Sequence, residues 1–111
     1  MAKGVVVYID GSVETKEFNS LQDFQQAVGG NVEAVPLGKD ADFYCNEDGK
    51  VICEPNVFGT FLAQTHASLF PGDYVAGNIV IIGKPDEDGK DTDAPEWVFQ
   101  LEKDFNAEGD V

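Results

Sequence analysis

The acidic segment 84–95 carries the side chains best suited to hold a metal ion. Four aspartates there offer the hard oxygen ligands that calcium prefers: Asp86, Asp88, Asp91 and Asp93. An EF-hand loop needs ligands at its first and twelfth positions, but with Gly89 as its glycine these positions hold Lys84 and Pro95. We therefore expect only weak, adventitious binding of divalent cations, and the sequence predicts no dedicated metal site.

The sequence lacks the residue spacing that a zinc site, a nucleophilic active site or a phosphate-binding loop requires. Cys45 and Cys53 are separated by seven residues, which fits no zinc signature, and His66 is the only histidine and has no catalytic motif around it. The pair Gly29–Gly30 follows an expected helix instead of preceding one, so the outward carbonyl groups there would repel a phosphate. We predict no catalytic residue and no cofactor, and the sequence favours a protein that is not an enzyme.

The hydrophobic pattern predicts short strands interspersed with helices. The predicted strands are 5–9 and 13–18 around a turn at Asp10–Gly11, 32–37 with Pro36 at an edge, a hairpin within 41–55 and a central strand within 74–83. The predicted helices are 20–28, which Gly29 ends with a positive φ, 57–70, which Asn56 caps, and 94–105. We expect these side chains on the buried sides of the last two helices: Val57, Phe61, Leu62, Leu69, Trp97, Val98, Leu101 and Phe105.

These elements predict an α+β fold, with a mostly antiparallel sheet of five or six strands and two or three helices packed on one side. Residues 1–83 would form the core, and the acidic loop and C-terminal helix of 84–111 would dock on the same domain. One register of the 41–55 hairpin puts Cys45 and Cys53 diagonally on one face, and the other puts them on opposite faces. We therefore expect two reduced, largely buried thiols.

The charge of the chain limits its partners. It carries 21 acidic residues against 7 basic ones, all lysine, and the formal net charge is −14. Such a surface repels DNA and RNA, and it lacks the arginine fork that reads phosphates and bases. The apolar run Ile79–Ile82 is too short to cross a bilayer. We therefore expect a soluble, cytoplasmic protein that binds neither nucleic acid nor membrane.

Four segments follow one another within residues 4–83: "GGNVEAVPL", "NEDGK", "EPN" and "GDYVAGNIVIIG". By their sequences and their order they resemble a small uncharacterised domain of bacteriophages, large algal viruses and bacterial accessory genes. The resemblance implies a viral or mobile-element accessory protein and brings no activity, cofactor or catalytic residue. This chain has no arginine near Asn56 and has a long acidic tail, which argues against recognition of a partner through basic residues there.

Charge and resemblance together favour a non-enzymatic accessory module that binds a host or viral protein with a basic surface. Its acidic C-terminal segment and the exposed side of the sheet would make the contact. The alternatives are a DNA-mimic inhibitor of a nucleic-acid-binding enzyme and a small-molecule-binding protein or enzyme with a pocket. Four residues are candidates for partner or ligand contact: Asn56, Asp73, Asn78 and Trp97. The first three border glycines or prolines, where such residues also cap helices and form turns.

Overall fold

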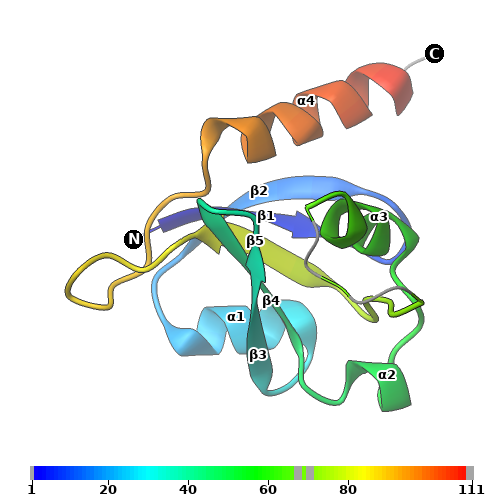
Figure 1. The fold of residues 1–111 in the computed structure, drawn as a ribbon, viewed down its shortest axis with the longest axis horizontal. Coiled ribbons are helices and arrows are strands. Elements are labelled where there is room, and N and C mark those ends of the chain that lie inside the picture. The colour runs from blue at the N-terminus through cyan, green and yellow to red at the C-terminus, as the bar shows by residue number, and fades with distance from the viewer. Residues whose placement is uncertain (1, 67–68, 70–71, 110–111) are drawn as a thin grey trace.

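A five-stranded antiparallel sheet forms the centre of the protein (Figure 1). The computed structural model describes residues 2–66, 69 and 72–109, with the backbone alone for 105–109. The strands are β1 (Ala2–Val7), β2 (Val13–Phe18), β3 (Val32–Leu37), β4 (Ala41–Asn46) and β5 (Ile79–Gly83), in the order β2-β1-β5-β4-β3. The predicted fold class is confirmed, and the central place of β5 and the edge position of β3 follow the prediction from sequence.

The helices are divided between the two faces of the sheet, whereas we expected them on one side (Figure 1). They are α1 (Leu21–Val28), α2 (Gly49–Ile52), α3 (Val57–Thr65) and α4 (Glu96–Gly109). One core holds Leu62 of α3 and Val98 of α4, and the other holds Phe24 of α1. All five residues of β5 are buried. Because successive side chains of a strand point to opposite faces of the sheet, both faces must be covered at β5. The sheet therefore has no fully exposed side to offer a partner.

The predicted 41–55 hairpin is wrong, because β4 is followed by the short helix α2. Both edges of β4 are already occupied, by β3 and by β5, so residues 51–53 have no strand to pair with. Asn46 ends β4: its Oδ1 accepts the Asp48 N–H at 2.8 Å. Cys45 and Cys53 are both free thiols, as expected, but they are half-buried instead of largely buried.

The glycine pair ends α1, as the sequence predicts. Gly29 has φ +80°, and its N–H donates to the Gln25 carbonyl at 2.9 Å. At the other end of the helix, Ser20 makes no side-chain cap, and the Asp23 carboxylate instead accepts the Asn19 N–H at 2.8 Å. The pair is therefore a helix terminator, and the free carbonyl groups at this end of a helix repel an anion.

The capping of α3 by Asn56 is confirmed, but its predicted buried side is partly wrong. Asn56 Oδ1 accepts the Gly59 N–H at 2.8 Å. Leu62 is buried, whereas Phe61 is 60% exposed and Val57 is also exposed. The helix turns Gly59 and Ala63 inward with Leu62, and a Cβ on Gly59 would lie 3.1 Å from Ile79. Gly59 lets α3 lie close to the sheet, and Val57 and Phe61 remain on the outer side of the helix. Leu69 packs against the core as expected, while residues 67, 68 and 70 of the predicted helix lie outside the described part of the chain.

The acidic loop after β5 returns along the sheet before α4 begins. The Gly83 N–H donates to the Thr92 carbonyl at 3.1 Å, and the Ala94 N–H donates to the Lys3 carbonyl at 2.8 Å. From there α4 lays Trp97, Val98 and Leu101 against the core, as predicted. Phe105 lies outside the described side chains. No helix in the described part of the chain combines the length and the apolar character that crossing a membrane requires.

Candidate functional site

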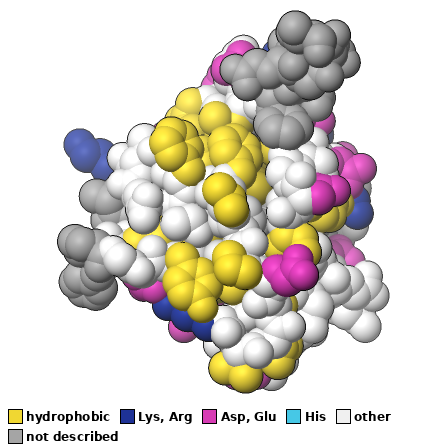
Figure 2. Space-filling view, turned by 90° about the vertical axis from the view of Figure 1, so that its right-hand side faces the viewer, with side chains coloured by type: hydrophobic (Ala, Val, Ile, Leu, Met, Phe, Trp, Pro, Cys, Tyr) yellow, Lys and Arg dark blue, Asp and Glu magenta, His cyan; other side chains and the backbone are white. Residues whose placement is uncertain are grey.

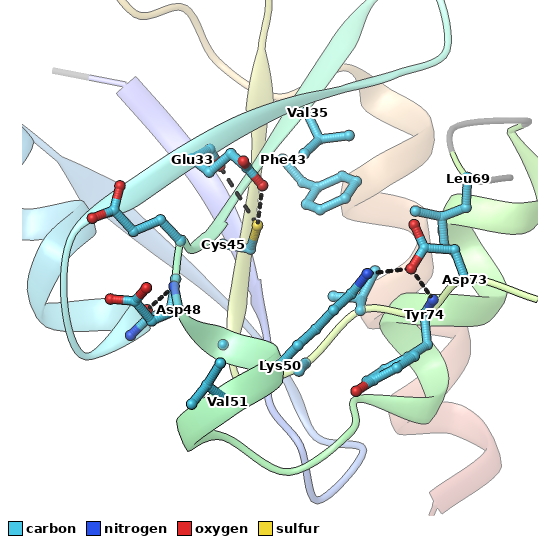
Figure 3. A pocket seen from close by; sticks show the side chains of 15 residues that line it. Glu33, Val35, Phe43, Cys45, Asp48, Lys50, Val51, Leu69, Asp73 and Tyr74 are labelled. Atoms are coloured by element: carbon cyan, nitrogen blue, oxygen red, sulfur yellow. Dashed lines mark hydrogen bonds and ion pairs between the residues drawn. The ribbon is translucent and has the colours of Figure 1, made fainter.

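A cavity of about 430 Å³ lies between α2, the β3–β4 pair and the segment that leads into β5 (Figure 3). Its apolar lining includes Phe43 and Val75, which are buried, and Val35, which is partly buried. Four carboxylates and one lysine also line it: Glu33, Glu47, Asp48, Asp73 and Lys50. The cavity thus combines an apolar interior with a strong excess of negative charge.

The lysine is held across this cavity by an ion pair. Lys50 reaches from α2 to Asp73, and its ammonium donates to the Asp73 Oδ1 (Figure 3). The same ammonium lies 5.2 Å from the ring centroid of Tyr74, within cation–π range. The Tyr74 N–H donates to Asp73 Oδ1 at 2.8 Å and fixes the carboxylate. The Lys50 hydrogen bond, followed by that of the Tyr74 N–H, lowers the pKa of Asp73, so this carboxylate is ionised at neutral pH.

Cys45 faces the cavity but is a poor nucleophile. Burial, with the nearby Glu33 carboxylate as a second cause, raises the pKa of its thiol from 9.0 to about 11. The thiolate is the reactive form of cysteine, so the thiol is almost entirely protonated near neutral pH. The cavity therefore offers a carboxylate-rich binding surface without an activated nucleophile at Cys45.

We predict that Cys45 reacts slowly with iodoacetamide. Two units of pKa reduce its thiolate fraction, and hence its alkylation rate at about pH 8, about hundredfold relative to an unperturbed cysteine. Mass spectrometry of the Cys53→Ser variant, with a short unstructured cysteine peptide in the same tube, measures this ratio. In Glu33→Gln the rate should rise only in part, because burial is the larger cause. Equal rates for Cys45 and the peptide would contradict the buried placement.

Of the four predicted contact residues, only Asp73 lines this cavity. Asn56 is 0% exposed and donates to the Val7 and Gly77 carbonyls at 3.0 and 2.9 Å, so it holds the backbone together. Asn78 lines a separate hollow, where its Oδ1 accepts the Ile9 N–H at 2.9 Å. Trp97 stacks on His66 and donates to Asp40. Asn56, Asn78 and Trp97 therefore serve the fold in this structure.

Three of the four metal candidates accept hydrogen bonds through their carboxylates, each from a different part of the chain. Asp86 accepts the N–H groups of Asp88 and Lys90, Asp91 accepts the Tyr44 hydroxyl, and Asp93 accepts the Lys3 N–H. Across the described residues, no three histidine, cysteine, aspartate or glutamate side chains form a group that could hold a metal ion. The structure thus gives Asp86, Asp91 and Asp93 a role in holding the loop in place.

Lys50 and Tyr74 are not among the site residues predicted from the sequence. Both belong to the segments "NEDGK" and "GDYVAG" that carry the resemblance, so a signal was present. The predicted hairpin placed 46–50 in a turn, away from 72–76. The isolated bridge between Pro55 and Ala76 instead brings the end of α2 beside the segment before β5. The pairing is long-range and has no local signature.

Two helices, α2 and α3, carry exposed apolar side chains. We call Val51 and Ile52 of α2 together with Val57 and Phe61 of α3 the α2–α3 apolar face. Val51 is 85% exposed and lines the cavity, whereas Ile52 lines the separate hollow that Asn78 also lines. Figure 2 shows hydrophobic side chains gathered on the side of the molecule where these two helices lie. Such a concentration of exposed apolar groups marks interaction sites on soluble proteins.

Comparison with known families gives a match over most of the chain. A family model described as "Domain of unknown function (DUF3846)" matches residues 2–106. The match extends past the 4–83 segments, through the acidic loop and most of α4. No curated protein and no solved structure matches the chain.

Proposed function

The chain belongs to the DUF3846 family, and from the surface that this domain presents we propose that it is a non-enzymatic protein-binding module. Its partner is a host or viral protein whose docking segment is apolar on one side and basic around it. The observation that carries the proposal is the α2–α3 apolar face beside a carboxylate-lined cavity. The viral accessory role, in the host cytoplasm, rests on the motif resemblance alone.

The apolar face supplies a reason to bind a protein. Covering a phenylalanine or valine that is exposed in the free protein removes apolar surface from water, which favours association. Side chains of this kind at the centre of a patch, with polar groups around them, are typical of protein interfaces. A DNA mimic would instead present rows of carboxylates, whereas this side of the molecule concentrates apolar groups.

The negative charge around the face indicates which kind of partner would bind. The cavity beside Val51 carries four carboxylates against one ammonium, and the whole chain has a net charge of −14. A basic partner is drawn toward such a surface, and an acidic one is repelled. The same charge opposes pairing of the face with a second copy of the chain. The favoured occupant is therefore a basic amphipathic segment of another protein.

We expect a short helical peptide of leucine and lysine to bind the α2–α3 apolar face. In isotope-labelled protein, its addition should shift the amide signals of Val51, Ile52, Val57 and Phe61. Phe61→Ser should weaken the peptide about tenfold, because a large apolar contact is lost. High salt should weaken it further.

The matched control is Leu21→Ser on α1. Leu21 is 59% exposed, against 60% for Phe61, and α1 packs on the opposite face of the sheet from α3. This variant should bind the peptide as the wild type does. If both variants bind equally, or if only residues 86–93 shift, the peptide recognises charge in general and the proposed face is wrong.

A further inference from the structure

A side chain of the protein itself, that of Lys50, lies in the cavity and places a cation there. The Lys50 ammonium bonds to Asp73 and lies over the Tyr74 ring. A carboxylate beside an aromatic face is a receptor for a cation. Lys50 acts here as the cation of the chain itself, held in the place where a cation from outside would sit.

This internal cation is easy to displace. The Lys50 and Asp73 side chains are 52% and 33% exposed, and ion pairs open to water in this way contribute little to stability. After Lys50 leaves, Asp73 stays oriented by the Tyr74 N–H. Three more carboxylates line the same cavity: Glu33, Glu47 and Asp48. The site therefore keeps its negative charge and an oriented Asp73 carboxylate after Lys50 leaves.

An arginine fits the vacated position better than the lysine does. Its planar guanidinium bonds to a carboxylate through two parallel N–H groups and stacks on an aromatic ring, whereas an ammonium is a point charge. Its aliphatic stem would pass over the apolar lining that includes Val35, Phe43 and Val75. The chain itself contains no arginine, so a guanidinium must come from another molecule.

We infer that the cavity is the receptor for a single arginine side chain of the partner, which displaces Lys50 and pairs with Asp73 beside Tyr74. The inference rests on the proposed function for the origin of the arginine. Displacement makes Lys50 a competitor within the chain, so a partner must present a guanidinium, and not just positive charge, to bind well here.

The test uses N-acetyl-arginine amide as the probe, with its uncharged analogue N-acetyl-citrulline amide for comparison. Nuclear magnetic resonance titration should show the arginine probe shifting Asp73 and Tyr74, with a dissociation constant on the order of 1 mM. The citrulline probe should produce no shift. Lys50→Met should tighten arginine binding about tenfold, and Asp73→Asn should weaken it about tenfold.

The matched control is Lys16→Met, which removes the same charge elsewhere. Lys16 is 53% exposed and pairs with Glu14 on β2. This variant should bind arginine as the wild type does. If Lys50→Met weakens the probe or leaves it unchanged, or if citrulline binds equally, the inference is overturned. The probe carries no apolar segment, so it tests the arginine receptor separately from the apolar face. If the arginine probe does not bind but the peptide still binds in a Phe61-dependent way, only the receptor is refuted. If the arginine probe binds but the peptide does not, only the apolar docking face is refuted.

Discussion

Replacing Asn56 with aspartate is expected to lower the free energy of unfolding by about 3–5 kcal/mol, a large part of the stability of a small domain. The two side chains have the same shape, so the change leaves no cavity. It replaces the amide NH₂, which donates to the Val7 and Gly77 carbonyls, with an oxygen that faces both of them. Because the side chain is 0% exposed, the new charge cannot reach water. Urea unfolding followed by circular dichroism measures the loss.

The pH dependence of this stability loss identifies the buried charge as its cause. Burial and the two facing carbonyls raise the pKa of the introduced carboxyl in the folded state above its unfolded value. The protonated form regains one donor, so the penalty is small at low pH and grows as the pH rises above about 4. A stability difference from the wild type that stays constant with pH would contradict this account.

Asn78→Asp is the matched control, since it makes the same substitution with the same change of charge. Asn78 is half-buried and uses only its oxygen, which accepts the Ile9 N–H, so an aspartate keeps that bond. Its expected cost is below about 1 kcal/mol. Equal losses for the two variants would show that added negative charge, and not the buried network, sets the stability.

Local signals in the sequence located most elements of the fold. Gly29 predicts the end of α1 because a positive φ there suits glycine, and Asn56 predicts the start of α3 because its side chain caps the helix. The Asp10–Gly11 turn predicts the first hairpin, although β1 ends earlier, at Val7. These features depend on a few adjacent residues, so they can be read without knowledge of the rest of the fold.

Local signals could not predict the candidate site, because the site depends on pairing between segments that are distant in the sequence. The "NEDGK" sequence suits a hairpin turn, but both edges of β4 are filled by β3 and β5, and the chain forms α2 instead. That change places Lys50 against Asp73 and creates the cavity. The outward position of Phe61 is similar: helical spacing fits more than one face, and contact with the sheet selects the side with Gly59.

Gly83→Ala is expected to release the loop and α4 from the sheet and to lower the free energy of unfolding by about 2–4 kcal/mol. A Cβ on Gly83 would lie 2.2 Å from Thr92 Oγ1 and 2.3 Å from the Asp93 carbonyl oxygen, so the 92–94 segment must move. That segment holds Lys3 through the Ala94 N–H and leads directly into α4. Overpacking at one strand end should therefore disturb a helix whose sequence is unchanged.

The single tryptophan reports this release. Trp97 stacks on His66, with ring centroids 4.4 Å apart, and its indole N–H donates to Asp40. In Gly83→Ala its fluorescence should shift to longer wavelength as water reaches the ring. The stacked rings of Phe18 and Phe24 lie in the opposite core, so their resonances should stay in place. If those resonances also move when the Trp97 emission shifts, the loop and α4 do not separate as a unit.

Gly89→Ala makes the same chemical change in the same loop with a different physical consequence. Gly89 has φ +79°, and no atom lies within 4 Å of its added Cβ. The variant therefore bears only the strain of a left-handed alanine, about 1 kcal/mol, without overlap. Its Trp97 emission should match that of the wild type. A red shift in this variant would mean that loop strain alone loosens α4, and would remove the steric contact at Gly83 as the cause.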